Sequence, residues 1–127
     1  MPRAGVEFDA KTKDLARVRA GGACEGCGAE NVPLEHHHRK FKSRGGLGVV
    51  ENDALLCGWG NHTGCHGRAH GPKPPVGWSV ASWSDPGEIE FEDLHGNRWL
   101  FLPDGTKTCV GRLAGNISTV EVDPWKP

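Results

Sequence analysis

Five of the seven histidines have a spacing that suits metal or acid–base chemistry. Three of them, His36 to His38, stand in a row, and His66 and His70 lie four residues apart. On a helix, that spacing places both imidazoles on one face. A neutral imidazole binds a divalent cation or takes up a proton near neutral pH. These histidines therefore predict a metal centre with a candidate general base beside it.

Four cysteines predict a second metal site. Cys24 and Cys27 are separated by two residues, as in zinc knuckles, and Cys57 and Cys65 follow later in the chain. Seven residues separate the second pair, where about two to four are typical, but glycines in this loop would let it fold back. We expect a structural Zn²⁺ bound by these four thiolates.

Other interpretations of the thiols stay open. A redox dithiol or two inert buried thiols would also account for Cys24 and Cys27, although no βαβ pattern surrounds them. His62 is a candidate to replace one cysteine ligand. Cys109 has no partner in this spacing and is predicted to be a small apolar residue.

Short elements must bring these residues together. The sequence predicts a helix over residues 12–20, with Thr12 as its N-cap and a glycine pair at its end. Two strands are expected over 33–38 and 54–57 as an antiparallel pair, followed by a short helix over 64–70. The strand pair and the second helix would then carry the histidines.

The rest of the chain predicts a β-rich extension. We expect residues 1–23 to lead into a core over residues 24–72, with two to four short antiparallel strands over 76–110 and a tail over 111–127. Four tryptophans are predicted to pack in the core or on strand faces rather than to stack on bases: Trp59, Trp78, Trp83 and Trp99.

Composition limits the class of protein. With 127 residues, 19 glycines and 9 prolines, the chain suits one loop-rich domain. Its net charge of −1 divides into +3 over residues 1–83 and −4 over residues 84–127, so the front of the chain suits a polyanion better than the back. No apolar run approaches the roughly 20 residues of a membrane span. We expect a protein of the reducing cytoplasm, where cysteines favour metal ions over disulfides.

The order of these residues resembles the HNH nuclease family, which has a ββα-metal fold. The similarity covers residues 24 to 70, and residues 77–105 resemble, more weakly, the tail of small phage-borne members. The matching stretches are HHRKFKSRGG at 37–46, END at 51–53, LC at 56–57 and GCHGRAH at 64–70.

The resemblance implies a role for each matching residue. His37, His66 and His70 would hold the metal, His38 would be the general base, and Asn52 would orient that base through its loop or its ring. The alternative pair, His36 and His37, stays open. The flanking cations are expected to contact DNA phosphates without reading sequence: Arg39, Lys40, Lys42, Arg44 and Arg68.

The fold implied is α+β, a ββα-metal (His-Me finger) core stapled by structural zinc, with a short N-terminal helix and a C-terminal antiparallel β extension. The activity implied is a metal-dependent DNA endonuclease that leaves 3′-OH and 5′-phosphate ends with one divalent ion, Mg²⁺, Mn²⁺, Ni²⁺, Co²⁺ or Zn²⁺. DNA would be the partner and, for a phage-type member in its host cytoplasm, also the terminase that packages the genome. The main alternative is a non-catalytic, zinc-stapled module that binds DNA or protein.

Overall fold

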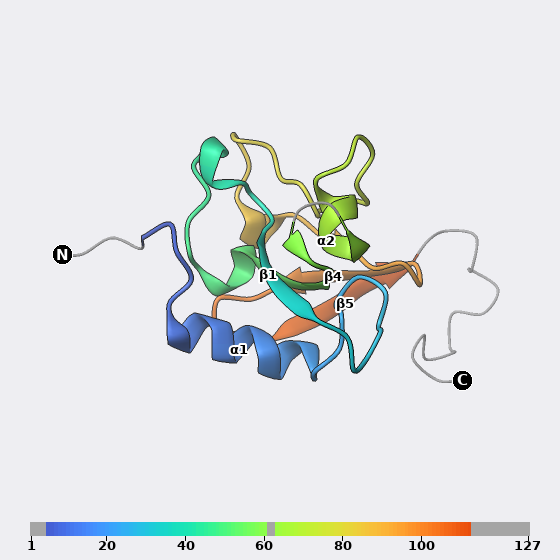
Figure 1. The fold of residues 1–127 in the computed structure, drawn as a ribbon. Helices are drawn as coiled ribbons and strands as arrows, with labels where there is room; N and C mark the ends of the chain where they lie inside the picture. Colours follow the sequence, from blue (N-terminus) through green and yellow to red (C-terminus); the bar gives the residue numbers. More distant parts are fainter. Residues whose placement is uncertain (1–4, 61–62, 113–127) are drawn as a thin grey trace.

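The computed structural model describes residues 5–60 and 63–112, which form a mixed α+β fold of short helices and two small antiparallel sheets (Figure 1). The helices are α1 (Ala10–Ala20) and α2 (Gly64–Ala69), with 3₁₀ turns η1 (Lys42–Arg44), η2 (Val50–Asn52) and η4 (Pro86–Glu88). The strands are β1 (Leu34–His38), β2 (Asp53–Cys57), β3 (Phe91–Glu92), β4 (Asn97–Phe101) and β5 (Lys107–Arg112). Within the described ranges, every helix is too short or too polar to cross a membrane.

Helix α1 forms where the sequence predicts it but begins earlier. Asp9 is the N-cap, and its carboxylate accepts a hydrogen bond from the backbone N–H of Thr12 at 2.8 Å. The prediction of Thr12 as the cap is therefore wrong, because an acidic residue three positions upstream satisfies the same free N–H groups. The helix ends as predicted at a glycine, Gly21, whose φ of 67° is left-handed.

The first sheet pairs β1 with β2 as predicted and puts the histidines at the end of a strand. His37 lies opposite Ala54, and His38 lies opposite Asp53. Because side chains alternate along a strand, His37 turns to the side of α2, whereas its two neighbours turn toward Phe8. The sheet thus sorts three adjacent histidines onto two faces.

The C-terminal part contains the predicted antiparallel strands, in the order β3-β4-β5. Trp78 packs on Phe91 at 5.5 Å and Phe91 on Phe101 at 5.0 Å between ring centroids, and all three side chains are fully buried. This apolar cluster continues into the first sheet and α2 through Cys24, Ala54, Leu56, Cys65 and Ala69. The two sheets therefore share one core.

Part of the predicted β extension forms turns. Over residues 78–83, the backbone N–H of Val80 bonds to the carbonyl of Arg39, and Ser84 N–H bonds to the carbonyl of Ala81. The prediction for two of the tryptophans is wrong. Trp59 and Trp83 are 72% and 87% exposed, so neither packs in the core. The aromatic side chains needed for the core come instead from Trp78 and the strands.

Arg39 is completely buried and ties the two parts together. Its guanidinium donates to the carbonyl oxygens of Gly77 (2.8 Å), Glu51 (2.9 Å), Pro86 (3.0 Å) and Ile89 (2.7 Å). Burial lowers the pKa of Arg39 to about 9, since the charged form is taken out of water. The prediction that Arg39 contacts DNA is therefore wrong: every bond of this guanidinium is directed into the protein.

Candidate metal centres and active site

Three histidines from two elements meet at one point. His37 stands near the end of β1, His66 lies inside α2 and His70 caps the end of that helix. One nitrogen from each ring lies within 4.8 Å of the other two, so the group can hold a metal ion. The structure thus brings together the predicted ligand set, and it places His37, not His36, in the group.

Hydrogen bonds outside the group fix how two of the rings face it. His37 donates through Nε2 to the backbone carbonyl of Trp78 at 2.7 Å, which leaves Nδ1 for a metal. His66 bonds through Nδ1 to the carboxylate of Glu35 at 2.7 Å, which leaves Nε2. Burial also lowers the pKa of His37 to about 3, so its ring is neutral and able to ligate.

Glu35 and the Trp78 carbonyl were absent from the sequence prediction. Glu35 was recognisable, because it lies two residues before His37 on the same side of a strand, where a carboxylate can reach a ligand on the facing helix. The Trp78 carbonyl had no such signal, since it arrives from a segment 41 residues away.

His38 lines the same pocket as the three-histidine group, a cavity of about 400 Å³. Its Nε2 donates to the backbone carbonyl of Val6 at 2.5 Å, and its ring stacks on Phe8 with centroids 4.0 Å apart. Because a carbonyl only accepts, Nε2 carries the hydrogen and Nδ1 keeps a lone pair for a proton. The segment before α1 therefore orients His38, which the spacing of the sequence motifs did not reveal.

His36 also lines this pocket but has a different partner. Its Nδ1 lies 2.8 Å from the carboxylate of Asp53, which is fully buried. Burial raises the pKa of Asp53 above its usual range, although the bond to His36 opposes this.

Asn52 holds the loop that follows β1. Its side-chain oxygen accepts from the N–H of Lys40 at 2.6 Å, and its amide donates to the carbonyls of Lys40 (3.1 Å) and Leu47 (2.9 Å). Of the two routes predicted for orienting His38, these bonds follow the loop route. The glycine pair of this loop has a steric reason as well: a Cβ on Gly46 would lie 1.7 Å from the Lys40 carbonyl oxygen.

The second predicted group forms from the four cysteines, which are free thiols with sulfurs within 4.8 Å of one another. A hydrogen bond from Cys65 lowers the pKa of Cys24 to about 4, with help from the backbone N–H groups of Gly26, Cys27 and Cys57. A preformed thiolate among three further sulfurs can bind a metal such as zinc.

The long loop between Cys57 and Cys65 folds back as expected. Gly64 has a φ of 60°, and a Cβ there would lie 2.5 Å from the Cys57 carbonyl oxygen. His62, the alternative ligand, lies outside the described residues. Cys109 is exposed on β5 and lies outside both candidate metal-binding groups.

The remaining predicted cations take different positions. Lys42 lines the histidine pocket and pairs with Glu7 at 2.6 Å, whereas Arg68 is exposed on α2. Lys40 lines a separate pocket. Arg44 places its guanidinium 4.4 Å from the ring centroid of Phe41. Four of the five predicted cations are therefore at least partly exposed to solvent, and one of them, Lys42, lines the histidine pocket.

No protein-family model, curated protein or solved structure matches the chain. The function must therefore be inferred from the residues of the site themselves.

Proposed function

We propose that the protein is a metal-dependent DNA endonuclease of the HNH type, with β1, β2 and α2 as a ββα-metal core. The observation that supports this most directly is the shared pocket: His38 lines the same cavity as the three-histidine group. A proton acceptor next to a metal-binding group is the combination that hydrolysis of a phosphodiester requires.

In the proposed reaction, Nδ1 of His38 takes a proton from a water molecule as the water oxygen attacks phosphorus. The bond from phosphorus to the 3′ oxygen breaks, and the 3′ oxygen takes a proton from solvent, which gives 3′-OH and 5′-phosphate ends. Val6 and Phe8 hold the ring in place during this transfer. A divalent ion on His37, His66 and His70 supplies Lewis-acid stabilisation of the crowded phosphate when it is bound.

The ligand chemistry favours particular metals. Three imidazoles suit Zn²⁺, Ni²⁺, Co²⁺ or Mn²⁺ more than Mg²⁺, which prefers oxygen ligands but can still act with help from the substrate phosphate. For the four-cysteine group we propose structural Zn²⁺, since four cysteine sulfurs within 4.8 Å of one another match the usual ligand set of a structural zinc site.

DNA is the proposed substrate because an exposed cation, Lys42, lines the pocket and another, Arg68, lies on the helix that carries two of the candidate ligands. Lys42 at the pocket, together with Arg68 on α2, would contact phosphates of any sequence. We propose low sequence specificity for this reason. A role as a phage accessory to DNA packaging, with the terminase as partner in the host cytoplasm, is the biological context that we propose from the resemblance.

Nicking of supercoiled plasmid tests the proposal. Wild-type protein incubated with each divalent metal should nick the plasmid, and His38→Ala should lower the rate by about 10²- to 10⁴-fold, the usual value of a general base. Val18→Ala is the control, because Val18 is 81% exposed on α1, a helix that contributes no residue to the pocket. If no metal supports nicking, or if His38→Ala nicks as fast as wild type, the proposal is wrong.

A further inference from the structure

Trp83 is the most exposed large apolar side chain of the described residues, at 87%. Tryptophan is strongly buried on average, so such exposure on an ordered segment is unusual. The segment is held on both sides: Val80 N–H bonds to the Arg39 carbonyl at 2.7 Å, and Ser84 N–H closes a turn onto Ala81 at 3.1 Å. The indole is thus presented to solvent by an anchored turn.

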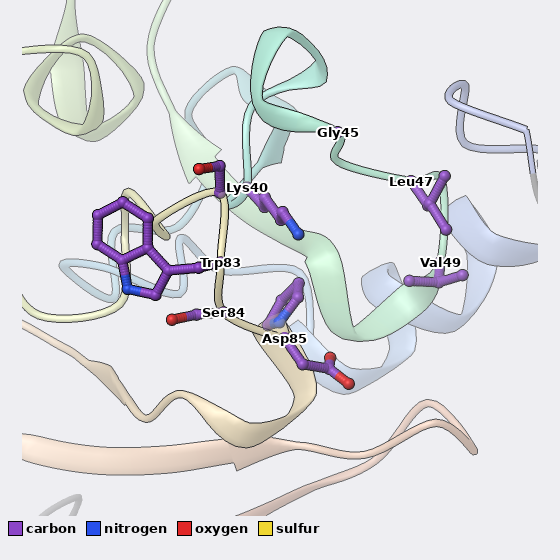
Figure 2. A pocket seen from close by; sticks show the side chains of 9 residues that line it. Lys40, Gly45, Leu47, Val49, Trp83, Ser84 and Asp85 are labelled. Atoms are coloured by element: carbon purple, nitrogen blue, oxygen red, sulfur yellow. The ribbon is translucent and has the colours of Figure 1, made fainter.

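Two pockets flank this turn, and their charges differ. The first, about 390 Å³, contains Lys40 but also Asp85, whose carboxylate repels a phosphate (Figure 2). In Figure 2 the indole of Trp83 points away from both of these residues. The second pocket, about 420 Å³, contains Arg44 and no acidic residue; it is lined by Arg44, Pro74, Ser79, Ala81, Ser82 and Trp83. The second pocket is therefore the one that suits an anion.

Contacts connect the second pocket to the histidine pocket. Phe41, which lines the histidine pocket, stacks on His70 with centroids 4.7 Å apart. The guanidinium of Arg44 lies over the Phe41 ring, 4.4 Å from its centroid, and donates to Ser79 Oγ at 2.8 Å and the Val80 carbonyl at 3.2 Å. One surface thus runs from the three-histidine group across Arg44 to the turn that carries Trp83.

We propose that a DNA strand leaving the candidate metal centre crosses Arg44 and stacks an unpaired base on Trp83. Arg44 and the serine hydroxyls of the pocket supply donors for phosphate, and the indole supplies a flat face for a base. A base inside an intact duplex has both faces covered by its neighbours. The substrate class is therefore DNA with a single-stranded segment beside the cleaved phosphate, which deepens the proposed nuclease function and rests on it.

Fluorescence anisotropy on a labelled oligonucleotide tests this surface. The same sequence is offered as a single strand, as a full duplex and as a duplex with an unpaired tail, with His38→Ala as the background so that no strand is cut. Trp83→Ala should weaken binding of the single strand and the tailed duplex by roughly 5- to 100-fold, the range for one stacked base. Binding of the full duplex should change less than about twofold, and Trp83→Phe should restore much of the loss, because a phenyl ring also stacks.

Val18→Ala is the matched control. Val18 is also strongly exposed, at 81%, but lies on α1, at the bottom of the view in Figure 1, whereas the turn near residue 80 lies at the top. If Trp83→Ala binds each of the three DNA forms as tightly as wild type binds it, the proposal is wrong. A wild-type dimer that Trp83→Ala dissociates would also overturn the proposal, because the indole would then serve contact between two copies.

Nicking and binding separate the two proposals. If wild type binds tailed DNA through Trp83 but nicks no plasmid with any metal, the nuclease function is wrong and the stacking surface stands. If wild type nicks and Trp83→Ala binds every DNA form as wild type does, the stacking surface is wrong and the nuclease function stands.

Discussion

Glu35 holds His66 in place from the neighbouring strand: its carboxylate lies 2.7 Å from Nδ1 of the imidazole. The same carboxylate oxygen accepts a hydrogen bond from the backbone N–H of Gly60 at 2.7 Å. One oxygen thus connects β1, the loop of the cysteine group and a candidate metal ligand on α2. The hydrogen bond from His66 keeps the pKa of Glu35 below its ordinary value, so the carboxylate is ionised and available to hold the ring.

Glu35→Ala is expected to weaken metal binding at the histidine group by about 10- to 100-fold, the usual effect of losing a carboxylate behind a ligating imidazole. Isothermal titration with Zn²⁺ or Ni²⁺, on protein whose cysteine group is already loaded, measures this affinity. Glu30→Ala is the control, since Glu30 is exposed outside the site. Unchanged affinity in Glu35→Ala would show that His66 needs no orienting partner.

Native mass spectrometry should find two metal ions per chain, one for each group of ligands. The double variant His66→Gln with His70→Gln should lose one ion and keep its fold, because the cysteine group is separate. The double variant Cys27→Ser with Cys57→Ser should lose the other ion. Wild-type protein with a single ion, lost only in the cysteine variant, would favour the non-catalytic binding module.

Phe8→Ala is expected to slow nicking by roughly 10- to 100-fold, because a general base that is displaced by about 1 Å loses its alignment with water. Phe8 stacks on His38 and is itself buried, at 8% exposure, so its removal frees the ring on one side. Phe8→Leu should retain more activity, since it still fills the space. The effect should appear in kcat with little change in KM; the reverse would mean that Phe8 acts through DNA binding.

Glu25→Gln is expected to destabilise the fold by about 3–5 kcal/mol, because it leaves the Arg19 cation buried without its counter-charge. The side chains of this ion pair are 0% and 1% exposed, with nitrogen–oxygen distances of 2.7 and 2.8 Å. Equilibrium denaturation in urea at neutral pH measures the loss. A cost below about 1 kcal/mol, typical of exposed pairs, would contradict the burial of the pair.

The Glu25 carboxylate also predicts how the stability of the fold depends on pH. Burial alone raises the pKa of Glu25, but the Arg19 guanidinium, together with Lys107 and the Leu55 N–H, outweighs it and leaves the pKa below the ordinary 4.5. The folded state therefore prefers the ionised form, so this contribution is present above pH 4.5 and is lost as the pH falls below it. The stability difference between wild type and Glu25→Gln should shrink in acid.

Much of the candidate site could be predicted from spacing along the chain. The cysteines and the i, i+4 pair His66 and His70 are local patterns whose geometry follows from a turn or a helix. The alternation of β1 then decides which of the adjacent histidines faces α2. Spacing could not predict contacts between segments that lie far apart in the chain. The hydrogen bond from His38 to the Val6 carbonyl is an example, because neither the sequence around Val6 nor the sequence around His38 differs from that of a solvated loop.

The cations and tryptophans show the same limit. Arg39 and Arg44 belong to one basic run, yet Arg39 is buried and Arg44 is exposed. The segments from residue 77 onward surround the Arg39 guanidinium with carbonyl acceptors, whereas Arg44 bonds to Ser79 and Val80 and stays at the surface. Trp78 and Trp83 likewise differ in burial, because Trp78 packs on Phe91 and Trp83 does not. Burial of one residue among similar neighbours depends on the whole fold, so composition and local pattern cannot assign it.

The guanidinium of Arg39 has a consequence for attempts to minimise the protein. Three of its four carbonyl acceptors belong to residues 77, 86 and 89, beyond the stretch that holds every candidate metal ligand. A protein truncated after α2 would leave the Arg39 charge without three of its acceptors, next to an apolar core that is exposed to water. The segment that holds both candidate metal centres therefore needs the C-terminal part of the fold to satisfy this buried charge.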